Sequence, residues 1–335
     1  MMVRGARKTL CIVCGTGSVG LRHLQVIDRA ADVPVAALPI RPERHGELAA
    51  LGFRVVESWG QAALLGATHA IIATDTWRHG IDVADAVKVG CQVLVEKPMA
   101  TDAASARATL GAVRDAGCDL WVGCCLRFQD GLNNFRDALP EIGRVHAVVA
   151  ACRSYLPDWR PERPYAASYS ARAEDGGVLR DAIHEIDYSG WLFGWPRAVR
   201  AHVRNLGRLG IGVEEAADLL WETESGAVVA VGLDYVSRPP QRWMRASGEH
   251  GWLHWDGLTG TVTVARGDGP VREIASRQTR DEMYLAQDLA FVRAVQGRSD
   301  PRSATGEDGV RALAVCDAAR RASESRAEES VRYLE

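Results

Sequence analysis

A glycine-rich stretch near the start of the chain, CGTGSVG at residues 14–20, limits the possible folds more than any other feature. Its glycines, Gly15, Gly17 and Gly20, follow the pattern G-x-G-x-x-G between an apolar run and a helical pattern. In a strand-turn-helix of this kind the first glycine permits the tight turn and the second lets the backbone approach a pyrophosphate. The third lets the helix pack closely on the sheet, and the pyrophosphate lies at the positive end of the helix. The stretch therefore predicts a dinucleotide site rather than a plain turn.

Short apolar runs alternate with helical patterns as far as about residue 125. The apolar runs lie at residues 9–14, 33–40, 69–73, 91–95 and 119–123, and the helical patterns at 19–30, 43–51, 80–89 and 102–116. Strands that alternate with helices form a parallel sheet covered on both faces. We therefore expect residues 1–125 to form an α/β, doubly wound Rossmann domain that binds NAD(P).

After about residue 127 the strand-like runs follow one another directly. They lie at residues 145–153, 199–204, 217–222, 227–235, 252–255 and 261–265, ahead of amphipathic helices at 283–295 and 306–323. Consecutive strands favour a mainly antiparallel sheet. We expect residues 126–335 to form a second, α+β domain.

The charge balance and the cysteines narrow the class of partner. The chain has 40 Lys and Arg against 43 Asp and Glu, a formal net charge of −3, so no global positive field exists to hold nucleic acid or an anionic membrane. No apolar run is long enough to span a membrane, and MMVRGARKTL lacks the apolar core of a signal peptide. The eight scattered cysteines fit reduced thiols, and strand alternation points Cys11 and Cys14 to opposite faces. We expect a cytoplasmic protein with a small-molecule partner and no metal site.

The residues after the second predicted strand bear on the choice of cofactor. A carboxylate about 20 residues after the glycines would bind the ribose of NAD. The strand instead ends in Pro39, Ile40 and Arg41, and the first carboxylate is Glu43. An arginine here could contact a 2′-phosphate, so Arg41 slightly favours NADP over NAD, with a plain surface arginine as the alternative.

The stretch VLVEKPMATD, residues 93–102, carries a candidate catalytic lysine. Pro98 restricts Lys97 to an extended backbone, so its side chain leaves the strand end at a fixed angle. The carboxyl ends of strands in a doubly wound sheet face the ligand crevice. Lys97 is thus predicted to point at a substrate, with a solvated loop lysine as the alternative.

The stretch GGVLRDAIHEIDYSGWLFG, residues 176–194, carries a candidate acid/base histidine. Asp181, His184 and Asp187 have helical spacing and are predicted to share one helix face. A histidine flanked by carboxylates is suited to general acid/base work, although a lone histidine on such a face is often structural. No second histidine or cysteine lies nearby at metal-ligand spacing.

Taken together, the motifs resemble those of the Gfo/Idh/MocA oxidoreductases, the glucose–fructose oxidoreductase and inositol dehydrogenase group. The motifs are GTGSVGLRH, ATDTWRHG, VLVEKP, GCCLRF, GGVLRDAIHEID and the tail DLAFVRAVQGRSDPRSATGEDGVRAL. The resemblance implies that NAD or NADP oxidises or reduces a hydroxyl of a sugar, cyclitol or related compound. It also implies an open, mainly antiparallel C-terminal sheet and a homodimer or homotetramer.

The resemblance implies roles for individual residues. Lys97 would hydrogen-bond the reacting oxygen and His184 would be the acid/base. Position 180, where many members carry an Asp, is Arg here, so either Asp181 or Asp187 would orient the histidine. The implied cofactor set is Gly15, Thr16, Gly17, Ser18, Val19, Gly20, Arg41, Thr74, Asp75, His79, Glu96 and Lys97. The implied substrate set is Lys97, Arg127, Tyr155, Trp159, Arg160, Tyr165, Asp181 and His184.

Residues 154–175, SYLPDWRPERPYAASYSARAED, are rich in aromatic and arginine side chains. Aromatic faces suit sugar rings, and arginines suit a carboxylate or phosphate, which favours a nucleotide-linked or amino sugar. A loop that packs on a partner subunit is the alternative. Two other functions remain open at this point: a non-catalytic NAD(P)-binding sensor, and an enzyme that recycles tightly bound cofactor without net redox change.

Overall fold

The computed structural model describes residues 10–30 and 33–333, which divide into two compact units. The first unit takes in the described residues up to 100 together with 104–125 and 279–307, and the second takes in the remainder. Residues 279–307, which the sequence analysis placed in the second domain, belong to the first unit. The reason is tertiary: a helix in this segment packs on the first helix of the chain, and a short strand extends the first sheet.

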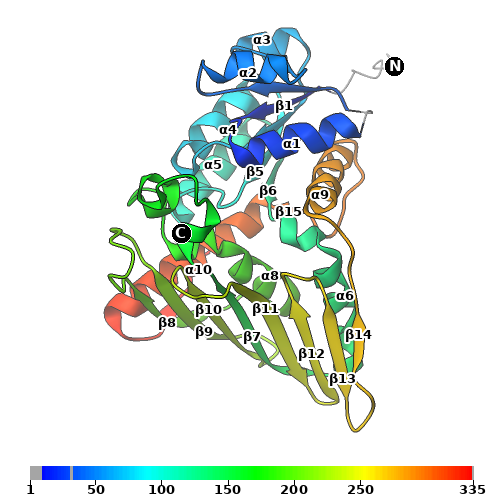
Figure 1. Ribbon diagram of the computed structural model, residues 1–335, viewed down its shortest axis with the longest axis vertical. Coiled ribbons are helices and arrows are strands. Elements are labelled where there is room, and N and C mark those ends of the chain that lie inside the picture. The colour runs from blue at the N-terminus through cyan, green and yellow to red at the C-terminus, as the bar shows by residue number, and fades with distance from the viewer. Residues whose placement is uncertain (1–9, 31–32, 334–335) are drawn as a thin grey trace. The chain divides into compact units, whose positions relative to one another are not determined.

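The first unit contains the predicted parallel sheet (Figure 1), in the strand order β15-β6-β5-β4-β1-β2-β3. The strands are β1 (Cys11–Cys14), β2 (Val35–Leu38), β3 (Arg54–Val55), β4 (His69–Ile72), β5 (Gln92–Glu96), β6 (Leu120–Gly123) and β15 (Ala304–Thr305). All pairs are parallel except β15 with β6. Every residue of β1 and β4 is buried, as expected of apolar strands covered on both faces. The chain crosses from one side of β1 to the other, so the glycine turn lies at the switch point where such sheets bind ligands.

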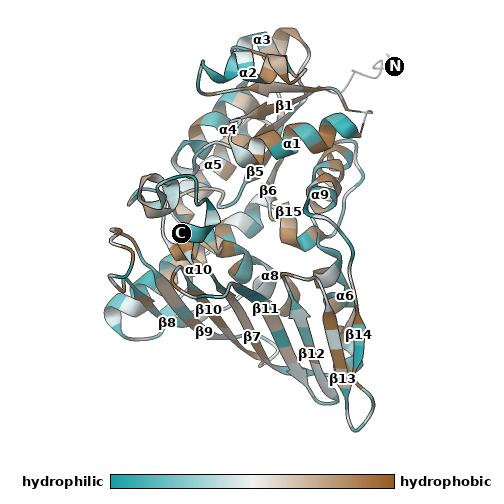
Figure 2. Cartoon of the chain, in the orientation of Figure 1, coloured by the Kyte–Doolittle hydropathy of each residue, from teal (hydrophilic) through white to brown (hydrophobic). Residues whose placement is uncertain are grey.

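Helices cover this sheet. They are α1 (Ser18–Arg29), α2 (Arg44–Ala50), α3 (Trp59–Leu64), α4 (His79–Lys88), α5 (Ala103–Asp115) and α9 (Arg280–Val295). Helix α1 carries both hydrophobic and hydrophilic residues (Figure 2), and its buried residues include Leu24 and Ile27. Helix α9 begins with a capping box in which Thr279 and Glu282 satisfy each other's backbone N–H groups. Local sequence therefore fixes where α9 starts, and packing against α1 fixes where it docks.

The second unit contains a nine-stranded sheet in the order β14-β13-β12-β11-β7-β10-β9-β8-β16. Its strands are β7 (Val145–Arg153), β8 (Ala198–Arg204), β9 (Ala216–Glu222), β10 (Val228–Asp234), β11 (Gln241–Gly248), β12 (Gly251–Asp256), β13 (Val262–Arg266), β14 (Arg272–Ile274) and β16 (Glu329–Ser330). Only β7 and β10 pair in parallel among these described strands, so the sheet is mainly antiparallel as predicted. Strand β11, QRWMRASG, was missed because only Met244 and Ala246 form its buried face, between arginines and polar residues.

The helices of this unit are α6 (Asp130–Ala138), α7 (Val178–Asp181), α8 (Ile183–Phe193) and α10 (Gly306–Ser325). The predicted continuous helix face through Asp181 and His184 is wrong, because the helix breaks at Ala182, which has φ −96° and ψ 30°. Asp181 ends α7 and His184 lies in the first turn of α8. The two side chains therefore belong to separate short helices.

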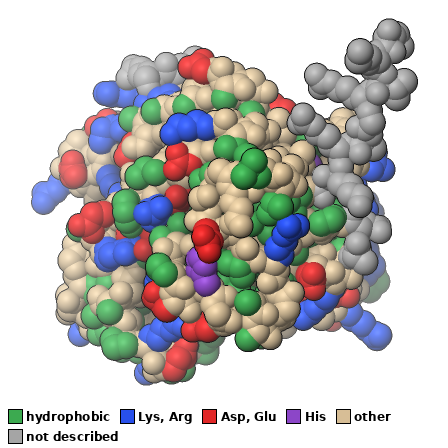
Figure 3. Space-filling model, turned by 90° about the horizontal axis from the view of Figure 1, so that it is seen from above, with side chains coloured by type: hydrophobic (Ala, Val, Ile, Leu, Met, Phe, Trp, Pro, Cys, Tyr) green, Lys and Arg blue, Asp and Glu red, His purple; other side chains and the backbone are tan. Residues whose placement is uncertain are grey.

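The charged side chains on the surface are of both signs (Figure 3), as the near-balanced net charge of −3 predicts. On the face drawn in Figure 3, Lys and Arg side chains are interspersed with Asp and Glu side chains over the described residues. Within the part of the chain that the structure describes, no helix combines the length and the apolar content needed to cross a bilayer.

Candidate active site

The turn between β1 and α1 has the geometry that a pyrophosphate needs. Gly15 has φ +86°, and a Cβ there would lie 2.6 Å from the Ala73 carbonyl oxygen. A Cβ on Gly20 would lie 1.8 Å from the Gly15 carbonyl oxygen. A Cβ on Gly17, the N-cap of α1, would meet nothing within 4 Å. The chain's own packing thus requires the first and third glycines, and the second borders open space beside a helix N-terminus, which fits the phosphates of NAD(P).

The rest of the turn and the end of β2 complete this edge of the candidate site. Thr16 is buried, Val19 is half-buried, and Ser18 and Arg41 are exposed. Arg41 is the predicted cofactor contact after β2, but Arg44 reaches the glycine turn, where its Nη2 donates to the Thr16 carbonyl oxygen (3.1 Å). Arg44 also binds Glu47, and its Nε is buried without a hydrogen-bond partner among the described residues.

The segment after β4 is held by side-chain hydrogen bonds of His79 and Thr74. His79 is buried, with Nδ1 2.9 Å from the Pro98 carbonyl oxygen and Nε2 3.1 Å from the Thr74 carbonyl oxygen. Burial lowers the pKa of His79, with the backbone contacts opposing that effect only in part. The Thr74 hydroxyl donates to Asp82 (2.7 Å), and Asp75 is exposed. His79 therefore ties the end of β4 to the segment after β5.

The end of β5 carries Glu96 and Lys97. Glu96 is buried, and its Oε2 accepts the backbone N–H of Lys97 (3.2 Å). Its Oε1 lies 3.0 Å from Nε2 of His23 on α1, whose Nδ1 lies 2.7 Å from Oδ2 of Asp288 on α9. Lys97 is half-buried just beyond the strand. The candidate lysine thus follows a carboxylate that is held from inside the protein.

Asp181, in the second unit, is held by two tyrosines. Its Oδ2 accepts the Tyr235 hydroxyl (2.5 Å), and the Tyr169 hydroxyl also bonds to it. Burial and then the Asp181 carboxylate raise the pKa of Tyr235, whereas the Asp181 carboxylate and then burial raise the pKa of Tyr169, so both phenols stay protonated donors. His184 is buried in the first turn of α8.

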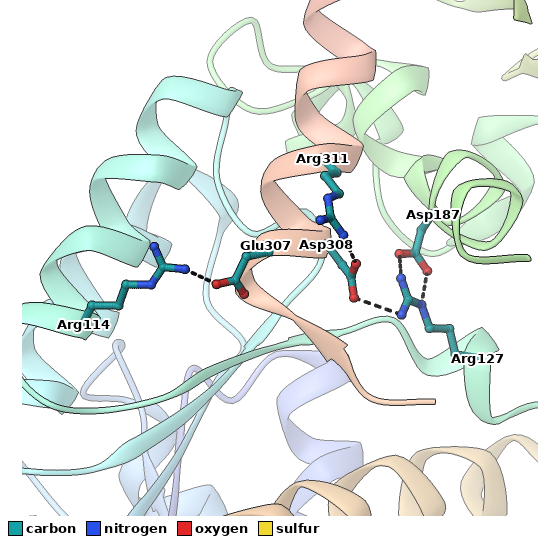
Figure 4. A network of polar contacts seen from close by, with 6 residues as sticks. All are labelled: Arg114, Arg127, Asp187, Glu307, Asp308 and Arg311. Atoms are coloured by element: carbon teal, nitrogen blue, oxygen red, sulfur yellow. Dashed lines mark hydrogen bonds and ion pairs between the residues drawn. The ribbon is translucent and has the colours of Figure 1, made fainter. Parts of the chain in front are cut away.

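Asp187, the other carboxylate near His184 in the sequence, is paired with Arg127 (Figure 4). Nε and Nη2 of Arg127 donate to the two Asp187 oxygens at 2.9 and 2.7 Å, and Nη1 donates to Asp308 at 3.2 Å. Arg127, from the 3₁₀ helix η2 (Cys125–Phe128), is 2% exposed. Arg127 was predicted to contact the substrate. The structure instead places its guanidinium group in the interior, where it binds protein carboxylates.

Residues 154–175 fold into the 3₁₀ turns η4 (Leu156–Trp159), η5 (Tyr165–Ala167) and η6 (Tyr169–Ala171). Trp159 is 41% exposed and packs edge-to-face on Tyr235, 5.5 Å between ring centroids. Arg238 lies 3.7 Å from the centroid of the Tyr155 ring, and Arg160 lies 5.9 Å from that of Tyr169. The Tyr165 hydroxyl donates to the Leu209 carbonyl oxygen (2.9 Å). The structure thus brings Trp159 and Asp181 to the same tyrosine.

Comparison with known proteins identifies the family. Residues 9–124 match the model of the oxidoreductase family with an NAD-binding Rossmann fold, and residues 140–254 match the GFO/IDH/MocA C-terminal domain. The chain belongs to the Gfo/Idh/MocA family of oxidoreductases.

Two curated relatives and one solved structure illustrate the match. The chain is 29% identical to 1,5-anhydro-D-fructose reductase of Ensifer adhaerens over 257 residues, 73% of this chain and 74% of the relative. It is 27% identical to inositol 2-dehydrogenase of Rhizobium meliloti (strain 1021) over 324 residues, 91% and 94% of the two chains. The structure of levoglucosan dehydrogenase in complex with NADH has a TM-score of 0.87 at 18% identity, covering 97% and 100%, and supports the fold alone.

These matches confirm the predicted family, fold class and enzyme class, an oxidoreductase with an NAD-binding Rossmann fold. In the described part of the chain, no group of three or more His, Cys, Asp and Glu side chains is arranged to hold a metal ion. Cys11 and Cys14 are buried, and burial raises the pKa of both thiols.

Three residues around the candidate site, His23, Asp288 and Tyr235, were not predicted from the sequence of this family member. His23 lies within the motif GTGSVGLRH, so its place after the glycines was the one available signal. Asp288 is 265 residues from His23, and Tyr235 is 54 residues from Asp181. No local pattern could have paired these residues.

Proposed function

We propose that this protein transfers hydride between NAD(P) and a secondary alcohol or ketone of a sugar, cyclitol or nucleotide-linked sugar. The observation that carries the proposal is the end of β5, where Lys97 follows a buried carboxylate two strands from the glycine turn. The carboxyl ends of such strands are where doubly wound sheets bind ligands. The names of the two curated relatives, a sugar reductase and a cyclitol dehydrogenase, support the substrate class.

We propose that Lys97 hydrogen-bonds the reacting oxygen and stabilises its developing negative charge, while His184 takes the hydroxyl proton during oxidation and returns it during reduction. When bound, the nicotinamide cofactor accepts or supplies the hydride. Of the two carboxylates considered for orienting His184, we propose Asp181. Asp187 already engages both oxygens with Arg127, whereas Asp181 is supported by phenols that also border the 154–175 segment.

We propose NADP as the preferred cofactor. No carboxylate follows β2 before Glu43, and both Arg41 and Arg44 lie after that strand. Arg44 supports this preference because it already contacts the glycine turn through the Thr16 carbonyl oxygen and has an unpaired buried Nε. An arginine at this place suits a 2′-phosphate.

We propose that Tyr155, Trp159, Arg160 and Tyr165 help to bind the substrate. The exposed Trp159 offers an aromatic face suited to a sugar ring. Arg160 offers donors suited to a carboxylate or phosphate. Because the Arg127 guanidinium is committed to protein carboxylates, we propose that it supports α8 and does not itself bind substrate.

We propose that the protein forms a homodimer or homotetramer through the exposed face of the second unit's sheet. The neighbouring strands β7, β10 and β9 carry exposed Val149, Val228 and Leu220. Apolar side chains exposed on adjacent strands are typical of a surface that another subunit covers.

The test is reduced-nicotinamide absorbance, with NAD⁺ or NADP⁺ offered together with sugars, cyclitols and nucleotide sugars. We expect a substrate-dependent signal from the wild type, larger with NADP⁺. In Lys97→Ala we expect turnover to fall by ~10²- to 10⁴-fold while the cofactor Kd changes little. Lys88→Ala, at an exposed lysine paired with Asp85, is the matched control and should keep wild-type turnover.

Equal turnover in Lys97→Ala and Lys88→Ala would contradict the assignment of Lys97. Tight cofactor binding with no net reduced nicotinamide from any substrate would favour a sensor or an enzyme that recycles its bound cofactor.

A further inference from the structure

Three ionisable side chains, Asp288, His23 and Glu96, form a connected network inside the first unit, and the proposed reaction assigns no role to His23 or Asp288. His23 is 0% exposed and lies between Asp288, also 0% exposed, and Glu96. The two contacts are 2.7 Å from Nδ1 to Asp288 and 3.0 Å from Nε2 to Glu96. The network of three side chains joins helix α9, which lies late in the sequence, to the last residue of β5.

Both neighbours of the imidazole ring are carboxylates, and this determines its proton count. An ionised carboxylate only accepts hydrogen bonds, so the ring satisfies both neighbours when both of its nitrogens carry a proton. Burial alone would lower the pKa of His23, but Asp288 and then Glu96 outweigh burial and raise the pKa to about 10. His23 is therefore an imidazolium donor throughout the neutral pH range.

Burial moves the pKa values of the neighbouring thiols, phenol and imidazole away from neutral pH. Burial raises the pKa of Cys11, which faces Asp288 from β1, and raises that of Cys125, near Glu96, to about 11. It also raises the pKa of Tyr284, whose ring lies 5.2 Å from that of His23, and lowers that of His79. Cations in this surrounding include Lys97, Arg280 and Arg22, whose guanidinium lies 5.5 Å from the centroid of the Tyr284 ring.

Glu96, at one end of this network of three side chains, contacts the candidate lysine. The Glu96 carboxylate receives His23 on one oxygen and the backbone N–H of Lys97 on the other. On the adjacent strand β6, a Cβ on Gly123 would lie 2.9 Å from the Glu96 carboxyl, so a side chain at position 123 would displace that group from its present place. The donor from His23 and the backbone N–H of Lys97 thus hold the two oxygens of this carboxylate.

We propose that His23 and Asp288 are positioning residues of the cofactor site: Asp288 keeps the His23 ring doubly protonated, and His23 in turn holds the Glu96 carboxylate that fixes the backbone at Lys97. This inference rests on the proposed function, since it requires Lys97 to act on the substrate. Charge-assisted hydrogen bonds are about twice as strong as neutral ones, so the protonated ring holds Glu96 better than a neutral ring would.

The decisive variant is Asp288→Asn, which keeps the size of the side chain and removes its charge. Without that charge the pKa of His23 falls toward neutrality, and Glu96 loses its charged donor as the pH rises. We expect hydride-transfer rates close to wild type at pH 6 and roughly 10- to 100-fold slower at pH 9, because a small misplacement of a catalytic group costs that much. The wild type should show no such additional loss.

Two readouts do not depend on turnover. Fluorescence titration of the reduced cofactor should give a Kd that weakens with pH in Asp288→Asn more than in the wild type. Nitrogen-15 NMR should show a doubly protonated His23 ring at pH 8 in the wild type and a singly protonated ring in the variant. Recovery of the variant at pH 6 separates this effect from misfolding.

Asp281→Asn is the matched control. Asp281 also links α9 to α1, through Arg22 (3.1 Å) and Arg29 (3.2 Å), but its side chain is 42% exposed and its ion pairs are with these arginines, away from Glu96. We expect it to keep the wild-type pH profile. If Asp288→Asn matched Asp281→Asn in rate, Kd and pH profile while the wild type turned substrate over, the inference alone would be overturned. A wild type that bound no nicotinamide cofactor would overturn the proposed function first, and the inference with it.

Discussion

The two units of the protein handle buried charge in opposite ways. In the first unit, His23 lies between the carboxylates of Asp288 and Glu96. In the second, Arg127 lies between the carboxylates of Asp187 and Asp308. Arginine keeps its proton at every pH a protein meets, whereas histidine exchanges one within the range of ordinary experiments. The ion pairs of Arg127 therefore join η2 to α8 and α10 at every pH, and we call them the permanent lock. The contacts of His23 with Asp288 and Glu96 weaken as the pH rises, and we call them the pH-dependent hold.

The strongest test of the permanent lock is Arg127→Met. This change leaves Asp187 buried without its guanidinium partner, so we expect the free energy of unfolding to fall by about 3–5 kcal/mol. Urea denaturation followed by circular dichroism measures this. A loss below about 1 kcal/mol would show that Asp187 finds another donor, and would remove the contrast between the two units.

The pH-dependent hold is tested with His23→Gln. The folded-state pKa of His23, about 10, lies above its ordinary value of 6.5. The stabilisation is therefore fully present below about pH 6.5 and is lost as the pH rises through 10. We expect the wild type to lose its advantage over His23→Gln across this range, as measured by urea denaturation at pH 6, 8 and 10. Parallel curves for the two proteins would contradict the raised pKa, and Arg127→Met should show no such convergence.

The smallest effect is expected from Arg114→Ala. Arg114 pairs with Glu307 in the first unit (Figure 4), but the two side chains are 61% and 45% exposed. Solvent-exposed pairs contribute about 0–1 kcal/mol, so the midpoint of urea denaturation should hardly move. A loss as large as that of Arg127→Met would show that burial is not what separates strong from weak ion pairs in this protein.

Much of the fold could be predicted because its signals are local. The apolar runs of β1 and β4 and the helical pattern of α1 lie within a few residues of where the structure has them. Strand β11 was missed because a strand with one buried face and polar residues between carries little apolar signal. The break at Ala182 was missed because Asp181 and His184 keep helical spacing in the sequence, whatever backbone lies between them.

The residues of the candidate site also divide into those with a local sequence signal and those without one. Lys97 and the glycine turn could be found from the sequence, because each depends on the residues next to it and on the strand before it. The sequence could not show that Arg127 pairs with Asp187. This pairing depends on η2 packing against α8, and the two residues are 60 positions apart. Which arginine after β2 reaches the glycine turn also depended on where α2 begins.

The sequence by itself determined the two folded units, the dinucleotide turn and the family, because backbone conformation and hydrophobic periodicity act over a few residues. Only the tertiary structure decided that α9 returns to the first unit, that Asp288 meets His23 across 265 residues, and that Asp181 is held by Tyr235. The physical reason is that buried polar groups must find partners, and the partner is whichever group the packing of distant elements brings within hydrogen-bond distance.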